Sequence, residues 1–259
     1  MSRGPLDEAT LISIAQRLPA FDPWADWAVA LHPDFISIAF PHESEIPVAS
    51  VALSDCAHTL YATRFALHEY LACGIYFRQH AEPLNEMLAV HREIYYLDDA
   101  ALRLYSAAEH LAEAVRCMLD RTDSDLAPYR KRGMSRWARI AAYLEDKHPT
   151  SPITHAFASL SNDEDWRLAI RYRGAWVHNQ PPTIHGLGLI YQRQKKWQKL
   201  PDGGWRLAIR RGETPEFTTD QLGAAFIAAI FRFADVFRVV LGHYEATLEA
   251  AGISFEERK

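Results

Sequence analysis

The chain has 259 residues, of which 49% are hydrophobic and 24% are charged, and its formal net charge is −5. This length suffices to bury a substantial core, and the composition is that of an ordinary globular protein rather than a disordered or fibrous chain. No apolar run follows Arg3, and the most apolar stretch, 222–240, is interrupted by charged residues, so we expect neither a signal peptide nor a membrane span. Three cysteines without a CxxC spacing indicate reduced thiols, and we expect a cytoplasmic protein.

Residues 1–50 form the least regular part of the sequence. Leu11, Ile14 and Leu18 recur at helical spacing after Asp7, which is a good helix-capping residue. The Pro- and Trp-rich stretch 19–47 predicts irregular structure with a short strand at 35–40. We therefore interpret residues 1–50 as an N-terminal extension that packs on the core.

Residues 51–259 contain long segments with apolar residues at helical spacing, bounded by capping residues or prolines. The predicted helices run from Ser54 or Asp55 to about His80, over 84–119, over 129–147, from Asn162 or Asp163 to the prolines at 181–182, and from Thr218 or Thr219 to Gly252. This pattern predicts a mainly all-α fold, an up-down bundle of four to five long helices.

A different pattern separates the last two predicted helices. The turn sequence Pro201-Asp-Gly-Gly204 lies between 189–200 and 205–211, which predicts a β-hairpin inserted at 188–212. This insertion has seven basic residues and one acid, a charge of +6, which leaves −11 for the rest of the chain. The seven are Arg193, Lys195, Lys196, Lys199, Arg206, Arg210 and Arg211.

The segment Arg173-Gly-Ala-Trp-Val-His178 is the first candidate for chemistry. An Arg and a His five residues apart at the end of a helix are expected on neighbouring parts of one face. Arg offers a permanently charged fork for a phosphate, and His exchanges a proton near neutral pH. Together they provide the minimum for metal-free RNA cleavage. The alternative is a helix end where His caps carbonyl groups and Arg pairs with an acid.

The second candidate is Tyr105-Ser-Ala-Ala-Glu109-His-Leu-Ala-Glu113-Ala, within the second long predicted helix. An Ala-Ala-Glu-x-Leu-x-x-Ala helix followed by Arg-x4-His resembles the HEPN superfamily (higher eukaryotes and prokaryotes nucleotide-binding). The lead-in 94–100 and the ending Trp176-Val-His178-Asn179 look most like a larger bacterial branch of that superfamily. The resemblance covers 54–179 and the last helix.

This resemblance implies a four-helix core, homodimerisation and metal-independent endoribonuclease activity in toxin–antitoxin, phage-defence or RNA-processing systems. By position, the catalytic residues of the family fall on Arg173 and His178, and a polar helper falls on Glu109 or, less closely, on Asp98. An antitoxin or a nucleotidyltransferase is the implied class of protein partner.

Two positions depart from the family pattern. Gly174 follows the arginine where Asn or Asp is common, which puts a supporting hydrogen bond in doubt. Gln180 stands where some members carry a tyrosine that a nucleotidyltransferase modifies, which argues against such a modification here. Glu109 and Asp98 have a further interpretation as partners of arginine side chains inside the core.

RNA is the expected ligand, and basic or polar residues near the two motifs are its candidate contacts. The basic hairpin is interpreted as a clamp on an RNA backbone or, alternatively, as a charged edge that discourages aggregation. The candidate RNA-binding residues are Arg171, Asn179, Lys195, Lys196 and Arg210.

No cofactor or metal is expected. Glu145-Asp-Lys-His148 is the only Glu-x-x-His, whereas a di-iron bundle needs two such motifs and two further Glu residues. No zinc-binding spacing and no phosphate-binding glycine loop occurs, and a Ser-His-Asp triad has no supporting motif. Two functions remain: an endoribonuclease, or a non-catalytic RNA- or protein-binding module of the same fold.

Overall fold

The computed structural model describes residues 4–20, 44–79, 83–131, 133–178, 184, 195–209 and 216–250. Most of these residues are helical, which confirms the predicted all-α class. The predicted strand at 35–40 lies outside the described residues.

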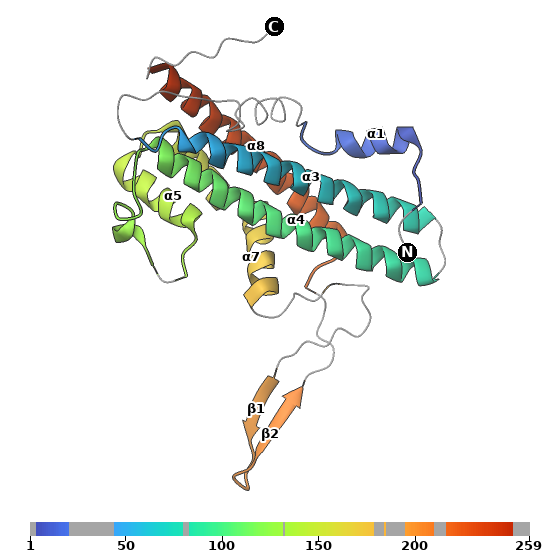
Figure 1. Cartoon of the computed structure of the whole chain (residues 1–259). Coiled ribbons are helices and arrows are strands. Elements are labelled where there is room, and N and C mark those ends of the chain that lie inside the picture. The colour runs from blue at the N-terminus through green and yellow to red at the C-terminus, as the bar shows by residue number, and fades with distance from the viewer. Residues whose placement is uncertain are drawn as a thin grey trace.

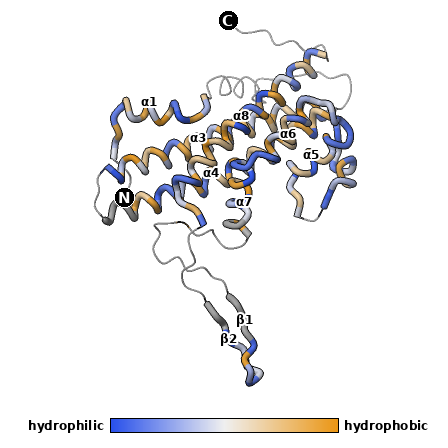
Figure 2. Tube along the Cα trace, turned by 180° about the vertical axis from the view of Figure 1, so that it is seen from behind, coloured by the Kyte–Doolittle hydropathy of each residue, from blue (hydrophilic) through white to orange (hydrophobic). Residues whose placement is uncertain are grey.

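Three long helices form the main body: α3 (Val48–Gln79), α4 (Pro83–Met118) and α8 (Thr219–Ala250). Helices α3 and α4 lie side by side along most of their length, and α8 packs against both (Figure 1). Hydrophobic and hydrophilic positions alternate along these helices, as expected for amphipathic helices that share a core (Figure 2). Their fully buried side chains include Leu53, Leu60, Leu67, Leu97, Leu104, Phe226, Phe233 and Phe237.

Shorter helices cover this body: α1 (Glu8–Gln16), α5 (Arg136–Lys147), α6 (Pro152–Asn162) and α7 (Glu164–His178), with a 3-10 turn, η2, at Ala127–Tyr129. Aromatic rings join α5, α6, α7 and α8. The Trp137 ring stacks on Phe157 with centroids 3.9 Å apart, and Trp166 stacks on Phe233 at 5.4 Å. These contacts fix the first half of α7 against α8.

The helix boundaries differ from the predicted ones in three places. Helix α3 begins at Val48, so Ser54 does not cap it and is instead buried within it. Helix α5 begins at Arg136 because Ser135 provides its cap through the N–H of Ala138. Helix α6 was not predicted. By contrast, Asp7 accepts the N–H of Thr10, which confirms the expected cap of α1.

The strands β1 (Lys195–Lys199) and β2 (Trp205–Ile209) pair antiparallel, with Trp197 opposite Leu207. Gly203 in the connection has φ of +85°, a conformation that favours glycine. Figure 1 shows this pair apart from the helices.

A buried polar cluster joins the three long helices at the start of α8. The Glu93 carboxylate is almost fully buried, accepts the Thr219 hydroxyl at 2.6 Å and lies 2.7 Å from the Arg78 guanidinium. The Tyr70 hydroxyl donates to the Thr219 carbonyl at 3.2 Å. Burial raises the pKa of Glu93, while the Thr219 hydroxyl and Arg78 oppose that rise. The cluster fixes the register of α8 against α3 and α4.

Among the helices that the structure describes, none is both long enough and apolar enough to cross a membrane.

Candidate functional site

Arg173 and Tyr105 meet where α7 lies against α4. The Arg173 guanidinium carbon lies 3.9 Å from the centre of the Tyr105 ring, a cation–π contact. This contact places the positive guanidinium over the ring, and a guanidinium is the side-chain group whose fork of N–H donors matches the oxygens of a phosphate. Both side chains are half-buried, which leaves them partly accessible from solvent.

Glu109 lies one helical turn beyond Tyr105 on α4 and faces the start of α5. Its carboxylate accepts the backbone N–H of Arg136 at 3.0 Å and of Trp137 at 3.2 Å. The first N–H groups of a helix have no partner within the helix, and a carboxylate there also stabilises the helix dipole. These two bonds attach α5 to α4, so the partner of Glu109 is a helix end rather than the arginine side chain that one sequence interpretation suggested.

The electrostatic surroundings of Tyr105 reflect both neighbours. Its pKa is raised mainly by partial burial and further by the Glu109 charge, while Arg173 acts in the opposite direction. The structure thus brings together Arg173 and Glu109, two of the three predicted catalytic residues, on either side of Tyr105. No motif in the sequence pointed to Tyr105, although its i, i+4 spacing from Glu109 places both on one helix face.

Asp98 lies two turns before Tyr105 on α4 and accepts the Tyr172 hydroxyl at 2.6 Å. Burial raises the pKa of Asp98 to about 6, although the hydrogen bond from Tyr172 acts to lower it. Burial and the Asp98 charge also raise the pKa of Tyr172. Asp98 is therefore a carboxyl group with a pKa of about 6. It is hydrogen-bonded to Tyr172, the residue immediately before Arg173.

His178 is the last residue of α7, and its side chain lies outside the described part of the chain. Five residues of a regular α-helix advance about 7.5 Å and turn about 140° around the axis. The backbone of α7 is helical through His178, and the expected proximity of the two side chains stays a prediction.

The remaining candidate contacts with RNA are only partly described. Arg171 is exposed on α7. The backbones of Lys195 and Lys196 lie in β1, whereas their side chains lie outside the described residues, as do Asn179 and Arg210.

A charge network that the sequence did not reveal flanks the site. The Arg116 guanidinium is largely buried and binds Glu113 at 2.8 Å and Glu45 at 3.2 Å. Glu113 also binds Arg136 at 3.1 Å, next to the backbone that Glu109 holds. A hydrogen bond from Arg116 is the main reason that the pKa of Glu113 is lowered. The network pairs residues from α4, α5 and the segment before α3.

Within the ranges described, no group of three or more His, Cys, Asp or Glu side chains is arranged to hold a metal ion. In comparisons with known proteins, no protein family, no curated protein and no solved structure matches the chain.

Proposed function

We propose that the chain is an endoribonuclease of HEPN type that cleaves RNA without a metal ion. The 2′-oxygen attacks the adjacent phosphorus, the bond to the 5′-oxygen breaks, and the products are a 2′,3′-cyclic phosphate and a 5′-hydroxyl. His178 takes the 2′-hydroxyl proton while water protonates the leaving 5′-oxygen, or His178 protonates that oxygen while water takes the 2′-hydroxyl proton. Arg173 stabilises the phosphorane charge.

The observation that carries this proposal is the stacking of Arg173 on Tyr105 at 3.9 Å. A flexible arginine on a surface loses side-chain entropy when it binds a phosphate, and a stacked one has already lost part of it. Arg173 and His178 both belong to α7, so a pair of chains presents two copies of each group.

Glu109 has a positioning role in this proposal. Its carboxylate is engaged by the N–H groups of Arg136 and Trp137, so it holds α5 beside Tyr105. Asp98 is a half-buried carboxyl group of α4 whose pKa burial raises to about 6.

We further infer a homodimer. Arg173 and His178 differ by about 140° around α7. A phosphate that needs both groups is therefore reached more readily when Arg173 comes from one chain and His178 from its partner. The same proposal treats 51–259 as one HEPN-like bundle of four to five long helices and the basic segment 188–212 as an inserted RNA clamp.

The test is RNA cleavage by the full chain in EDTA. Wild-type protein, His178→Ala, Arg173→Gln and Arg167→Gln are incubated with end-labelled RNA, and the termini are identified. Arg167 is an exposed arginine on the same helix and serves as the matched charge control. We expect cyclic-phosphate ends from wild type and Arg167→Gln, and no cleavage by the other two.

Mixing the two inactive variants tests the dimer. If each site combines Arg173 and His178 from different chains, a mixture of His178→Ala and Arg173→Gln regains up to about a quarter to a half of the wild-type activity after subunit exchange, because some dimers carry one intact site. Loss of wild-type activity in EDTA, or unchanged cleavage by His178→Ala, contradicts the proposed mechanism.

A non-catalytic RNA-binding module of the same fold is the second candidate. The engagement of the Glu109 carboxylate by α5 favours it, because this carboxylate is then not available for proton transfer. Salt-sensitive RNA binding without cleavage by the wild-type chain supports the module and excludes the enzyme.

A further inference from the structure

A second basic run, separate from the hairpin, lies where α5 begins. Between Pro128 and Leu144 the chain has five basic residues and no acidic one, although its net charge is −5. The segment that leads into α5 and helix α7 extend on the same side of α4 (Figure 1). The five basic residues are Arg130, Lys131, Arg132, Arg136 and Arg139.

One face of α4 brings this basic run next to Arg173. Tyr105, Glu109 and Glu113 follow at intervals of four residues, which is about 6 Å along a helix. The Arg173 guanidinium lies over Tyr105. Glu109 accepts the backbone N–H of Arg136, and Glu113 binds the guanidinium of the same residue at 3.1 Å. Cations from α7 and from the start of α5 therefore follow one another along a single face of α4.

Glu113 has more positive neighbours than its own charge balances. Arg116 lies 2.8 Å and Arg136 lies 3.1 Å from its carboxylate. The hydrogen bond from Arg116 is the main reason that the pKa of Glu113 is lowered, and the charge of Arg139 also contributes. Glu45 supplies a second carboxylate, 3.2 Å from Arg116. Three guanidinium groups therefore share two carboxylates, which leaves one positive charge in excess.

Arg139 is the arginine that carries this excess charge. In the described part of the chain, no group forms a hydrogen bond or an ion pair with its side chain. Its Nε is buried without a partner, whereas its two terminal nitrogens reach solvent. A partly desolvated cation without an acceptor is unfavourable, and an anion at the terminal N–H groups offsets this cost.

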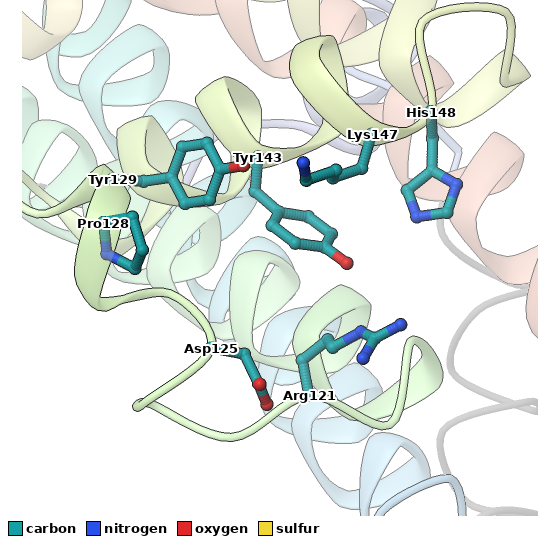
Figure 3. A pocket seen from close by; sticks show the side chains of 7 residues that line it. All are labelled: Arg121, Asp125, Pro128, Tyr129, Tyr143, Lys147 and His148. Atoms are coloured by element: carbon teal, nitrogen blue, oxygen red, sulfur yellow. The ribbon is translucent and has the colours of Figure 1, made fainter.

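The opposite end of α5 has no such excess among the described residues. A hollow there is lined by Arg121, Asp125 and Lys147, among others (Figure 3). Lys147 lies 3.0 Å from Asp146, and Asp125 brings a carboxylate to the same hollow as Arg121. The cations at that end therefore have carboxylates of their own, and the positive end of α5 is its start.

Arg130 and Lys131 extend the positive surface away from α4. Both side chains are exposed, and neither forms an ion pair within the ranges that the structure describes. The Met134 N–H donates to the Lys131 carbonyl at 3.1 Å, so a turn leads from these cations to Ser135, the cap of α5.

We propose that Arg130, Lys131 and Arg139, which we call the α5 basic segment, bind the phosphate backbone of an RNA strand that continues from Arg173. The Arg139 fork matches phosphate oxygens, and such contacts position a strand without reading its sequence. This inference rests on the proposed function in taking Arg173 as a point that RNA reaches, but it does not require cleavage. It adds the direction in which the strand leaves that point.

The test is binding of a fluorescent 2′-O-methyl RNA dodecamer, which cannot be cleaved through its 2′-oxygen, measured by anisotropy at several salt concentrations. Each lost phosphate contact should lower the slope of log K against log salt by about 0.7. Arg139→Gln should therefore weaken binding about 5-fold at 0.1 M salt, and the double variant Arg130→Gln/Lys131→Gln about 25-fold. Arg139→Lys keeps the charge and should keep the slope.

Arg167→Gln is the matched control, because Arg167 is exposed on α7 and lies outside the α5 basic segment. It should leave the affinity and the slope unchanged. Melting temperatures test whether Arg139→Gln remains folded. Because Arg130 and Lys131 are exposed, their double variant tests the segment even if Arg139→Gln loses stability.

A competitor identifies the class of ligand. Poly-L-glutamate carries the same sign of charge as RNA but has no phosphate groups. Displacement of the RNA by poly-L-glutamate at equal charge concentration, with the same loss in the variants, would assign the segment to an acidic protein and overturn the proposal. We expect RNA to be retained.

Two further results overturn the proposal: wild-type protein that binds no RNA, and variants that bind RNA with wild-type affinity and slope. The second result, together with cleavage by wild type, leaves the proposed ribonuclease intact. Conversely, weaker binding by both variants of a protein that never cleaves RNA supports the α5 basic segment and contradicts the ribonuclease.

Discussion

The carboxylate of Glu109 accepts the backbone N–H of Trp137 at 3.2 Å, so a residue of α4 completes the first turn of α5. The Arg136 N–H forms the second bond, at 3.0 Å. The sequence resemblance placed Glu109 among catalytic residues, whereas its hydrogen bonds join two helices.

Replacing Glu109 with Ala should destabilise the fold by about 1–2 kcal/mol, because two N–H groups lose their partner and the α5 dipole loses a nearby charge. Urea unfolding followed by circular dichroism measures this loss. Glu109→Gln keeps one acceptor oxygen and should have a smaller effect. A Gln variant of wild-type stability that no longer cleaves RNA would instead assign Glu109 to proton transfer.

Tyr105→Leu should lower the free energy of unfolding and weaken RNA binding, because the ring that orients Arg173 is lost. A cation–π contact at a partly exposed site is worth about 0.5–1 kcal/mol. Tyr105→Phe keeps the ring and should behave like wild type in unfolding and in RNA binding measured by filter retention. Equal loss in both variants would show that the hydroxyl, rather than the stacking, matters.

The Asp98 carboxyl should make the stability depend on pH. Burial raises its pKa from 3.8 to about 6, so the folded state holds the proton more tightly than the unfolded state does. This contribution to stability is present at low pH and is lost as the pH rises from about 4 to about 6.

Asp98→Asn does not titrate, and its carbonyl can still accept the Tyr172 hydroxyl. We take the unfolding free energy of the wild type minus that of Asp98→Asn. This difference should fall as the pH rises from about 4 to about 6, and it should stay constant above about pH 7. Urea unfolding at several pH values provides the measurement. A difference that rises with pH would contradict the raised pKa.

Gly223→Ala should be strongly destabilising. A Cβ at Gly223 would lie 2.2 Å from the Tyr70 hydroxyl oxygen, which donates to Thr219 in the buried cluster. We expect a loss of about 1–3 kcal/mol in thermal or urea unfolding.

The matched control is Gly242→Ala on the same helix, where a Cβ would meet nothing within 4 Å. This change should stabilise α8 by about 0.5–1 kcal/mol, because alanine loses less backbone entropy in a helix. If Gly223→Ala is as stable as Gly242→Ala, the close packing of α8 on α3 at Tyr70 is not rigid.

Local sequence signals determined several element boundaries. Helix α4 runs over Pro83–Met118, close to the predicted 84–119, because apolar spacing and the absence of internal Gly and Pro are properties of the segment itself. Helix α8 begins at Thr219 because the Thr218 hydroxyl accepts the N–H of Gln221, which is also a local signal. The start of α3 was predicted too late, because Ser54 is a good capping residue in isolation but is buried by tertiary packing.

In the candidate site, too, local sequence specified some features and tertiary packing specified others. The sequence by itself selected Arg173 and Glu109, since each lies in a short local motif. Only the tertiary structure decided that the Arg173 guanidinium lies over the Tyr105 ring and that Glu109 is held by the start of α5. Local spacing specifies which face of a helix a residue occupies, whereas its partner depends on helices that are distant along the chain and meet only when the core is buried.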